Sequence, residues 1–172
     1  MELRELKEIV GILKGLDLIS WPTLSIGFEN GWVQRSEIVE YALNVMTTSV
    51  EDNFKEVILL AGSELYDHDE FKQILVGVLN KKGFDASNVN NKNIESDKWR
   101  LGFLIFLDSK TSTPEFKLDK LQKLYSQFNY PEDMAACSCY YNPLDNDSYE
   151  GPLNELKTVI IKLKTKLGRS EF

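Results

Sequence analysis

The sequence is poor in the residues that most often build metal sites and cross-links. It holds one histidine, His68, and two cysteines, Cys137 and Cys139, among 172 residues. Two cysteines cannot cross-link a chain of this length, so we expect the protein to fold in the reducing cytoplasm without structural disulfides. One histidine and one Cys-x-Cys pair also fall short of the usual zinc ligand sets. The sequence therefore predicts neither a metal site nor a cofactor.

Long apolar runs are missing as well. The longest, around residues 101–107, is far shorter than the roughly 18 residues that a membrane-spanning helix needs. The first five residues, Met-Glu-Leu-Arg-Glu, show no basic start followed by an apolar block, so no signal peptide is predicted. We therefore expect a protein that does not associate with membranes.

An excess of positive charge is also absent. The chain has 20 Lys and Arg against 27 Asp and Glu, which gives a net charge of −7. A nucleic-acid binder needs a basic surface, so we expect no nucleic-acid partner. The acidic balance suits a basic protein partner instead. Because 42% of the residues are hydrophobic, the chain has enough apolar surface for a core and is not a disordered protein.

Helical periodicity dominates what is present. Ser36, the pair Ser49 and Asp52, the pair Asp67 and Glu70, and Thr113 before Pro114 are expected to cap helix starts. Apolar residues repeat at intervals of three and four behind these caps, as in amphipathic helices. The clearest stripes are Ile38, Tyr41, Ala42, Val45 and Met46; Phe71, Ile74, Leu75, Val78 and Leu79; and Leu153, Leu156, Ile160, Leu163 and Leu167.

Three segments are harder to assign. Residues 24–28 alternate in polarity and suit either a strand or a helix. Residues 99–107 are apolar nearly all round, and we predict a helix because every neighbouring element is one. Residues 86–97 hold four Asn and two Ser, which predicts a polar loop. The predicted fold is a single all-α domain over 1–172, with seven or eight helices paired as hairpins in two layers and a division into halves at loop 86–97.

Two acidic segments invite a metal-binding interpretation, and neither meets the requirements. Asp67, Asp69 and Glu70 surround His68, but carboxylates at a helix start are explained by capping and by the helix dipole. Residues 145–151 open like a calcium-binding loop, yet Leu156 stands where the last carboxylate ligand should be.

Motifs for nucleophilic or nucleotide chemistry are not present either. No Gly-x-Ser-x-Gly elbow and no glycine-rich phosphate loop occur in the chain. Cys137-Ser138-Cys139 permits redox chemistry, although free cysteines are more often small buried apolar groups. We therefore predict no catalytic, cofactor-binding or metal-binding residue.

The loop after Tyr140 is the predicted partner-binding surface. It combines tyrosine rings, which offer rigid contact area, with carboxylates that complement Lys and Arg on a partner. The alternative is a solvated loop whose rings fold back onto the core. The predicted binding residues are Tyr140, Tyr141, Asp145, Asp147, Tyr149 and Glu150.

The segment Tyr125-Ser126-Gln127-Phe128-Asn129-Tyr130-Pro131-Glu132 resembles the signature of an uncharacterised bacterial family, a domain of unknown function. Its members carry Tyr-x-Asp-Phe-x-Tyr-Pro-Glu here, so Gln127 departs from the pattern. A Tyr-Met-Pro turn of the family corresponds to residues 140–143, which lack the Met and gain one residue. Leu18 to Trp21 and Glu37 to Ala42 match near the N-terminus. The resemblance implies no catalytic residue, and similar small acidic proteins resemble immunity proteins encoded beside toxins.

The sequence thus leads to a first hypothesis of a cytoplasmic immunity protein that occludes a basic toxin domain. A carboxylate- or metal-dependent enzyme, using Asp145 and Asp147 or residues 67–70, is the alternative. A third reading is an oligomerisation module built on residues 153–167, but two heptads are short for a coiled coil. The partner's identity and the oligomeric state are not determined by the sequence.

Overall fold

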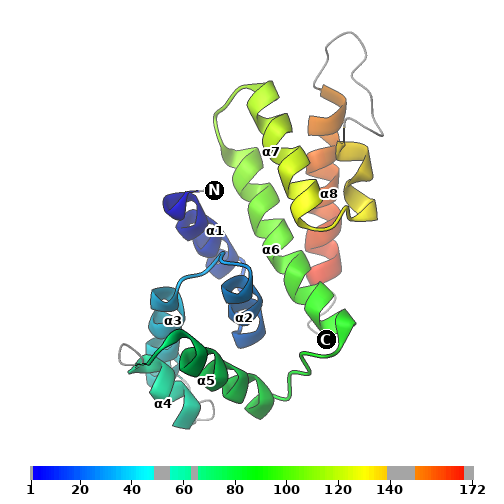
Figure 1. Cartoon of the computed structure of the whole chain (residues 1–172). Coiled ribbons are helices and arrows are strands. Elements are labelled where there is room, and N and C mark those ends of the chain that lie inside the picture. Colours follow the sequence, from blue (N-terminus) through cyan, green and yellow to red (C-terminus); the bar gives the residue numbers. More distant parts are fainter. Residues whose placement is uncertain (1, 49–54, 63–65, 139–149, 169–172) are drawn as a thin grey trace. The chain divides into compact units, whose positions relative to one another are not determined.

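The computed structural model describes residues 2–48, 55–62, 66–138 and 150–168, and these residues form helices without strands (Figure 1). The predicted all-α fold class is confirmed. Among the described helices, none is long and apolar enough to cross a bilayer. The helices are α1 (Leu3–Gly15), α2 (Trp21–Glu29), α3 (Arg35–Thr48), α4 (Lys55–Ala61), α5 (His68–Lys81), α6 (Val89–Ser109), α7 (Pro114–Gln127), the 3-10 helix η2 (Glu132–Cys137) and α8 (Glu150–Gly168).

The chain divides into two compact units. Unit 1 comprises Met1–Lys7 and Ile19–Glu95, and unit 2 comprises Glu8–Leu18 and Ser96–Phe172. In unit 1, α4 packs against α3 and α5, and α2 also packs against α5. In unit 2, η2 packs against α7 and α8, and α7 packs against α8 (Figure 1).

Side-chain caps explain where several helices begin. The predicted capping box at α5 is confirmed: Asp67 accepts hydrogen bonds from the Asp69 and Glu70 amides, and Glu70 accepts one from the Asp67 amide. The predicted cap of α7 by Thr113 is confirmed too. The predicted cap at Ser36 is wrong because α3 begins one residue earlier, at Arg35. The predicted pair at residues 49 and 52 lies outside the described residues.

Four helices end in the same way, with a Schellman motif. At α1, α2, α5 and α7, the residue two positions beyond the helix has its φ between +57° and +70°, in the left-handed region. The amide after it then donates to a carbonyl five residues back, which satisfies a helix-end acceptor. Glycine adopts this conformation without strain, and Asn and Asp tolerate it best among the others. The four residues are Asp17, Gly31, Gly83 and Asn129.

The structure resolves the three ambiguous segments as helix. Residues 24–28 lie in α2, which Ser20 caps and Pro22 starts. Residues 99–107 lie in α6, as predicted. The predicted polar loop over 86–97 is wrong, since α6 begins at Val89. The Asn88 side chain accepts from the Asn90 amide at 2.9 Å, so this asparagine caps a helix instead of breaking one.

The polar start of α6 is held by a buried contact in unit 1. The Glu95 side chain is only 6% exposed. The Thr23 hydroxyl of α2 donates to its Oε2 atom at 2.5 Å, which compensates part of the cost of burying a carboxylate. This contact joins residues 72 positions apart, so no local pattern predicts it.

The α8 helix also begins earlier than the breakers in its sequence suggest. Gly151 and Pro152 are residue types that often interrupt helices, but they belong to the first turn of α8. Proline is compatible with that position because the first helical amides have no partner within the helix. The predicted apolar stripe of α8 faces the core of unit 2 at Leu156, Ile160, Leu163 and Leu167.

Candidate functional site

The predicted partner-binding surface falls almost entirely outside the described residues. Tyr140, Tyr141, Asp145, Asp147 and Tyr149 lie there, and so does the side chain of Glu150, the first residue of α8. The site prediction therefore stays a prediction. The structure does describe the elements of unit 2 that precede and follow this segment, which are η2 with Ser138 on one side and α8 on the other.

A buried arginine fastens η2 to α6. The Arg100 side chain is only 4% exposed, and its Nη1 and Nη2 atoms donate to the two carboxylate oxygens of Asp133 at 2.6 and 2.9 Å. Its Nη2 atom also lies 2.8 Å from Oδ1 of Asp97, one turn earlier on α6. Lys166 of α8 reaches the other Asp97 oxygen at 2.6 Å. A bidentate contact between a guanidinium group and a carboxylate fixes the relative orientation of the two groups and also compensates their charges.

A second set of contacts fastens the end of η2 to α7. The Gln122 amide group donates to the Cys137 carbonyl at 3.0 Å, and the Ser138 hydroxyl donates to the Gln122 oxygen at 3.2 Å. The Cys137 thiol itself is buried and free. Burial, followed by the charges of Glu155 and Asp133, raises the pKa of this thiol to about 12. Such a thiol stays protonated near neutral pH, so Cys137 is an apolar core residue and not a nucleophile.

The residues before η2 form an exposed corner with an unusual backbone. Asn129 and Tyr130 both have positive φ, +60° and +56°. For a residue as large as tyrosine this conformation is strained, and such strain persists only where neighbouring structure enforces it. The Tyr130 amide donates to the Tyr125 carbonyl at 2.8 Å, and its ring packs edge-on against that of Tyr125 at 5.2 Å. The Tyr130 side chain is nevertheless 63% exposed.

We call Tyr130, Glu132 and Asp133 the acidic corner. Glu132 is exposed, and the Asp133 side chain is one-third exposed while it binds Arg100. The corner therefore presents one aromatic ring and two carboxylates at the start of η2. In the sequence, this segment carried the family resemblance but was not predicted as a binding surface. Asn129 was the signal in the sequence for the unusual backbone of this corner, because asparagine tolerates the left-handed conformation.

Metal binding finds no support in the described part of the chain. No group of three or more His, Cys, Asp or Glu side chains there could hold an ion. The carboxylates of Asp67 and Glu70 accept backbone hydrogen bonds of the α5 cap. The ring of His68 packs on Phe28 at 5.4 Å. The residues around His68 thus serve the helix start.

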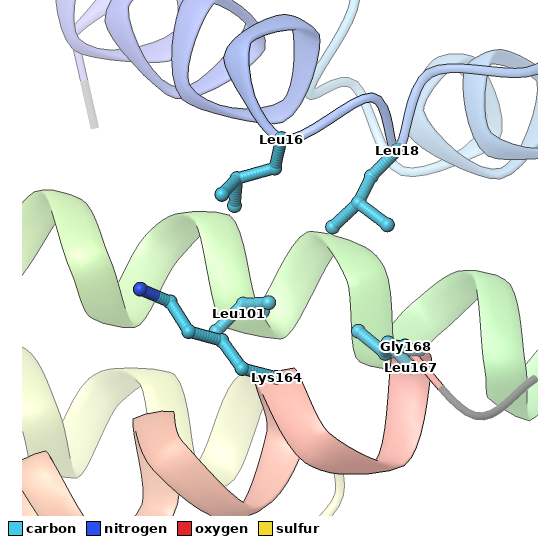
Figure 2. A pocket seen from close by; sticks show the side chains of 6 residues that line it. All are labelled: Leu16, Leu18, Leu101, Lys164, Leu167 and Gly168. Atoms are coloured by element: carbon cyan, nitrogen blue, oxygen red, sulfur yellow. The ribbon is translucent and has the colours of Figure 1, made fainter.

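Unit 2 also contains a hollow of about 260 Å³ (Figure 2). Leu16 and Leu18, which follow α1, face Leu101 of α6, and Lys164 and Leu167 of α8 complete the walls. The lining is apolar apart from the single amine of Lys164. No carboxylate, histidine, cysteine or hydroxyl side chain is among the described lining residues that surround the Lys164 amine.

Comparisons with known proteins give a match to one protein family. No curated protein and no solved structure matches the chain. Residues 13–167 match the family described as "Uncharacterized protein conserved in bacteria (DUF2247)". This match covers most of the chain, including the segment around Tyr130 that carried the resemblance. The chain therefore belongs to this bacterial family.

Proposed function

We propose that this protein is a cytoplasmic binding protein of the immunity type, which neutralises a basic toxin domain by occluding it. The observation that carries the proposal is the acidic corner: an exposed tyrosine, held in a strained conformation, stands beside two carboxylates. Tyrosine contributes a large rigid contact area at low entropy cost. Strained backbone conformations cluster at active sites, ligand clamps and switch regions. The net charge of −7 adds long-range attraction for a basic partner.

The mechanism requires a rigid surface and not a catalytic group. Arg100 and Gln122 hold η2 by several hydrogen bonds at both of its ends. A preorganised surface loses little conformational entropy on binding, which favours slow dissociation. The exposed Glu132 carboxylate mainly accelerates association and selects against acidic partners, because Arg100 already compensates the charge of Asp133.

The segment 140–150 remains part of the proposed binding surface on the basis of its sequence. It follows η2 directly in the sequence and repeats its combination of tyrosines and carboxylates. The free thiol of Cys137 supports a reducing compartment, because structural disulfides are common in secreted proteins.

The first experiment identifies a partner. The tagged chain is expressed in its native host, and the retained proteins and the neighbouring reading frame are examined. We expect a basic protein with a toxin-like activity that the chain inhibits. A host pull-down without such a protein, together with an unrelated neighbouring gene, would remove the main support for the immunity role.

The second experiment tests the surface with that partner by calorimetry. The double variant Tyr130→Ala, Glu132→Lys is compared with a control, Phe116→Ala, Glu115→Lys, which removes another exposed ring and reverses another exposed carboxylate. We expect the affinity for the partner to fall about tenfold or more in the first variant and to fall less in the control. Equal losses would show that only net charge matters. The triple variant Asp145→Lys, Asp147→Lys, Glu150→Lys tests the adjoining segment in the same way.

A further inference from the structure

A groove in unit 1 is a second candidate binding surface, separate from the acidic corner. It lies between α4 and α5 and encloses about 390 Å³. Leu59 and Ile74 give it an apolar wall, and Gly77 leaves space where another residue would project a side chain. The polar part of the lining consists of Glu56, Tyr66, Glu70 and Gln73. The groove therefore combines apolar surface with two carboxylates and one aromatic ring.

The two carboxylates mark opposite ends of the groove. A Cβ atom at Gly77 would lie 3.0 Å from Cγ and 3.9 Å from Cδ of Glu56, so the Glu56 carboxyl group sits beside position 77 of α5. Glu70 lies seven residues earlier on the same helix. Seven residues correspond to two helical turns and about 10 Å. Ile74 lies between the two ends.

Neither carboxylate has a cationic partner among the described residues. Glu70 accepts one hydrogen bond from the Asp67 amide through its Oε2 atom, and its other oxygen is available. The Tyr66 end is held in place by Arg35, which donates to the Tyr66 and Asp67 carbonyls at 2.7 Å each. Arg35 also stacks on the Phe71 ring at 4.4 Å. Arg35 therefore positions the groove but does not neutralise it.

We infer that this groove docks a basic amphipathic helix of a protein partner. The helix would present Lys or Arg at positions i and i+7 to Glu70 and Glu56, and an apolar residue at i+3 or i+4 to Leu59 and Ile74. A helix lying along α5 has the same rise per residue as α5, so its residues stay in register with those of the groove. Helix-in-groove binding uses anchors with this spacing.

The charges and the shape both select this occupant. An acidic helix would bring like charges together, and a purely apolar one would leave both carboxylates without partners. Tyr66 adds a ring face that can receive a guanidinium group. The inference concerns a surface separate from the acidic corner and requires only a basic partner.

The test uses the full chain and a synthetic helical peptide followed by fluorescence anisotropy. The peptide carries arginine at i and i+7 and leucine at i+3 and i+4 in an alanine and glutamine background. A second peptide of the same composition moves the later arginine to i+5, on another face of the helix. We expect the first peptide to bind with a Kd below about 1 mM and the second to bind at least fivefold more weakly.

Variants of the protein locate the binding. Glu56→Gln with Glu70→Gln removes both charges, and glutamine at position 70 can still accept the Asp67 hydrogen bond of the α5 cap. The control, Glu29→Gln with Glu115→Gln, changes the net charge equally at two other exposed positions. Melting curves confirm that both variants fold. We expect about tenfold weaker binding for the groove variant and less than a twofold change for the control.

Three results would overturn the inference. These are no binding of the first peptide at about 1 mM, equal binding of the two peptides, or equal effects of the groove and control variants. None of them bears on the proposed function, which depends on the native partner and on variants at Tyr130 and Glu132. If the variants at Tyr130 and Glu132 alone lost binding to the native partner, the proposed function would be supported and the result with the peptides would still stand by itself.

Discussion

Two glycines within helices are expected to respond to alanine with opposite signs. Gly102 of α6 packs against α1 in unit 2, where a Cβ atom would lie 3.1 Å from carbon atoms of Ile9 and Leu13. Both neighbours are fully buried, so they cannot move aside easily. Gly77 of α5 would bring its Cβ to 3.0 Å from Cγ of Glu56, a half-exposed and flexible side chain.

The magnitude follows from two opposing terms. Alanine is favoured over glycine within a helix by about 1 kcal/mol. Overpacking a well-filled core costs about 1–3 kcal/mol. For Gly102→Ala the second term exceeds the first, and we expect a net loss of about 1 kcal/mol in the free energy of unfolding. For Gly77→Ala the side chain of Glu56 shifts at little cost, so we expect a net gain of about 0.5–1 kcal/mol.

Urea unfolding measures the two changes. Far-UV circular dichroism follows the helices of both units. We expect the variants to differ by about 1.5–2 kcal/mol, which corresponds to several degrees in Tm for a chain of this size. If Gly102→Ala were as stabilising as Gly77→Ala, the close approach of Ile9 and Leu13 to Gly102 would be refuted.

Three further predictions concern individual side chains. Arg100→Met leaves the Asp133 and Asp97 carboxylates without their buried partner. Because Asp133 keeps one-third exposure, we expect the free energy of unfolding in urea to fall by about 2–3 kcal/mol, and a fall below about 0.5 kcal/mol would contradict the ion-pair network. Asp17→Gly places glycine at a φ of +57° and removes an anion from a helix C-terminus, so the stability should rise by about 0.5–1 kcal/mol, whereas a decrease would argue against the Schellman motif there. Cys137, studied in a Cys139→Ser background, has a pKa of about 12 in the folded protein against 9.0 for an ordinary thiol. Its contribution to the free energy of unfolding is complete below pH 9 and falls above pH 9, because the thiol of the unfolded chain then ionises. Between pH 8 and pH 10 the protein should therefore lose about 1.3 kcal/mol more than its Cys137→Ala counterpart, and parallel pH profiles would contradict the burial of the thiol.

Local signals in the sequence account for much of the fold. The Asp67 and Glu70 capping box and the Thr113 cap before Pro114 were predictable, because each is built by residues within one helical turn. The apolar stripes of α5 and α8 were predictable because helical periodicity alone aligns them. The absence of a catalytic motif follows from the same printed residues, and the family resemblance rests on the segment around Tyr130.

Two segments were not assigned correctly from composition and alternation, because capping residues and one long-range contact determine their structure. The Asn-rich start of α6 reads as a loop by composition, yet Asn88 caps it and Thr23 of α2 binds its Glu95. Residues 24–28 alternate like a strand, but Ser20 and Pro22 start a helix there. In both segments, capping and tertiary contacts outweighed weak intrinsic preferences.

The candidate surfaces depend most on tertiary structure. The sequence directed attention to residues 140–150, through tyrosines and acids that are adjacent in the chain. The acidic corner needs Arg100 and Asp133, which are 33 positions apart, and the groove needs Glu56 beside Gly77. Periodicity and capping act over three or four residues, so the sequence by itself determined the fold class and the strongly periodic helices. Which side chains meet across them is set by the packing of whole helices, and only the tertiary structure decided that.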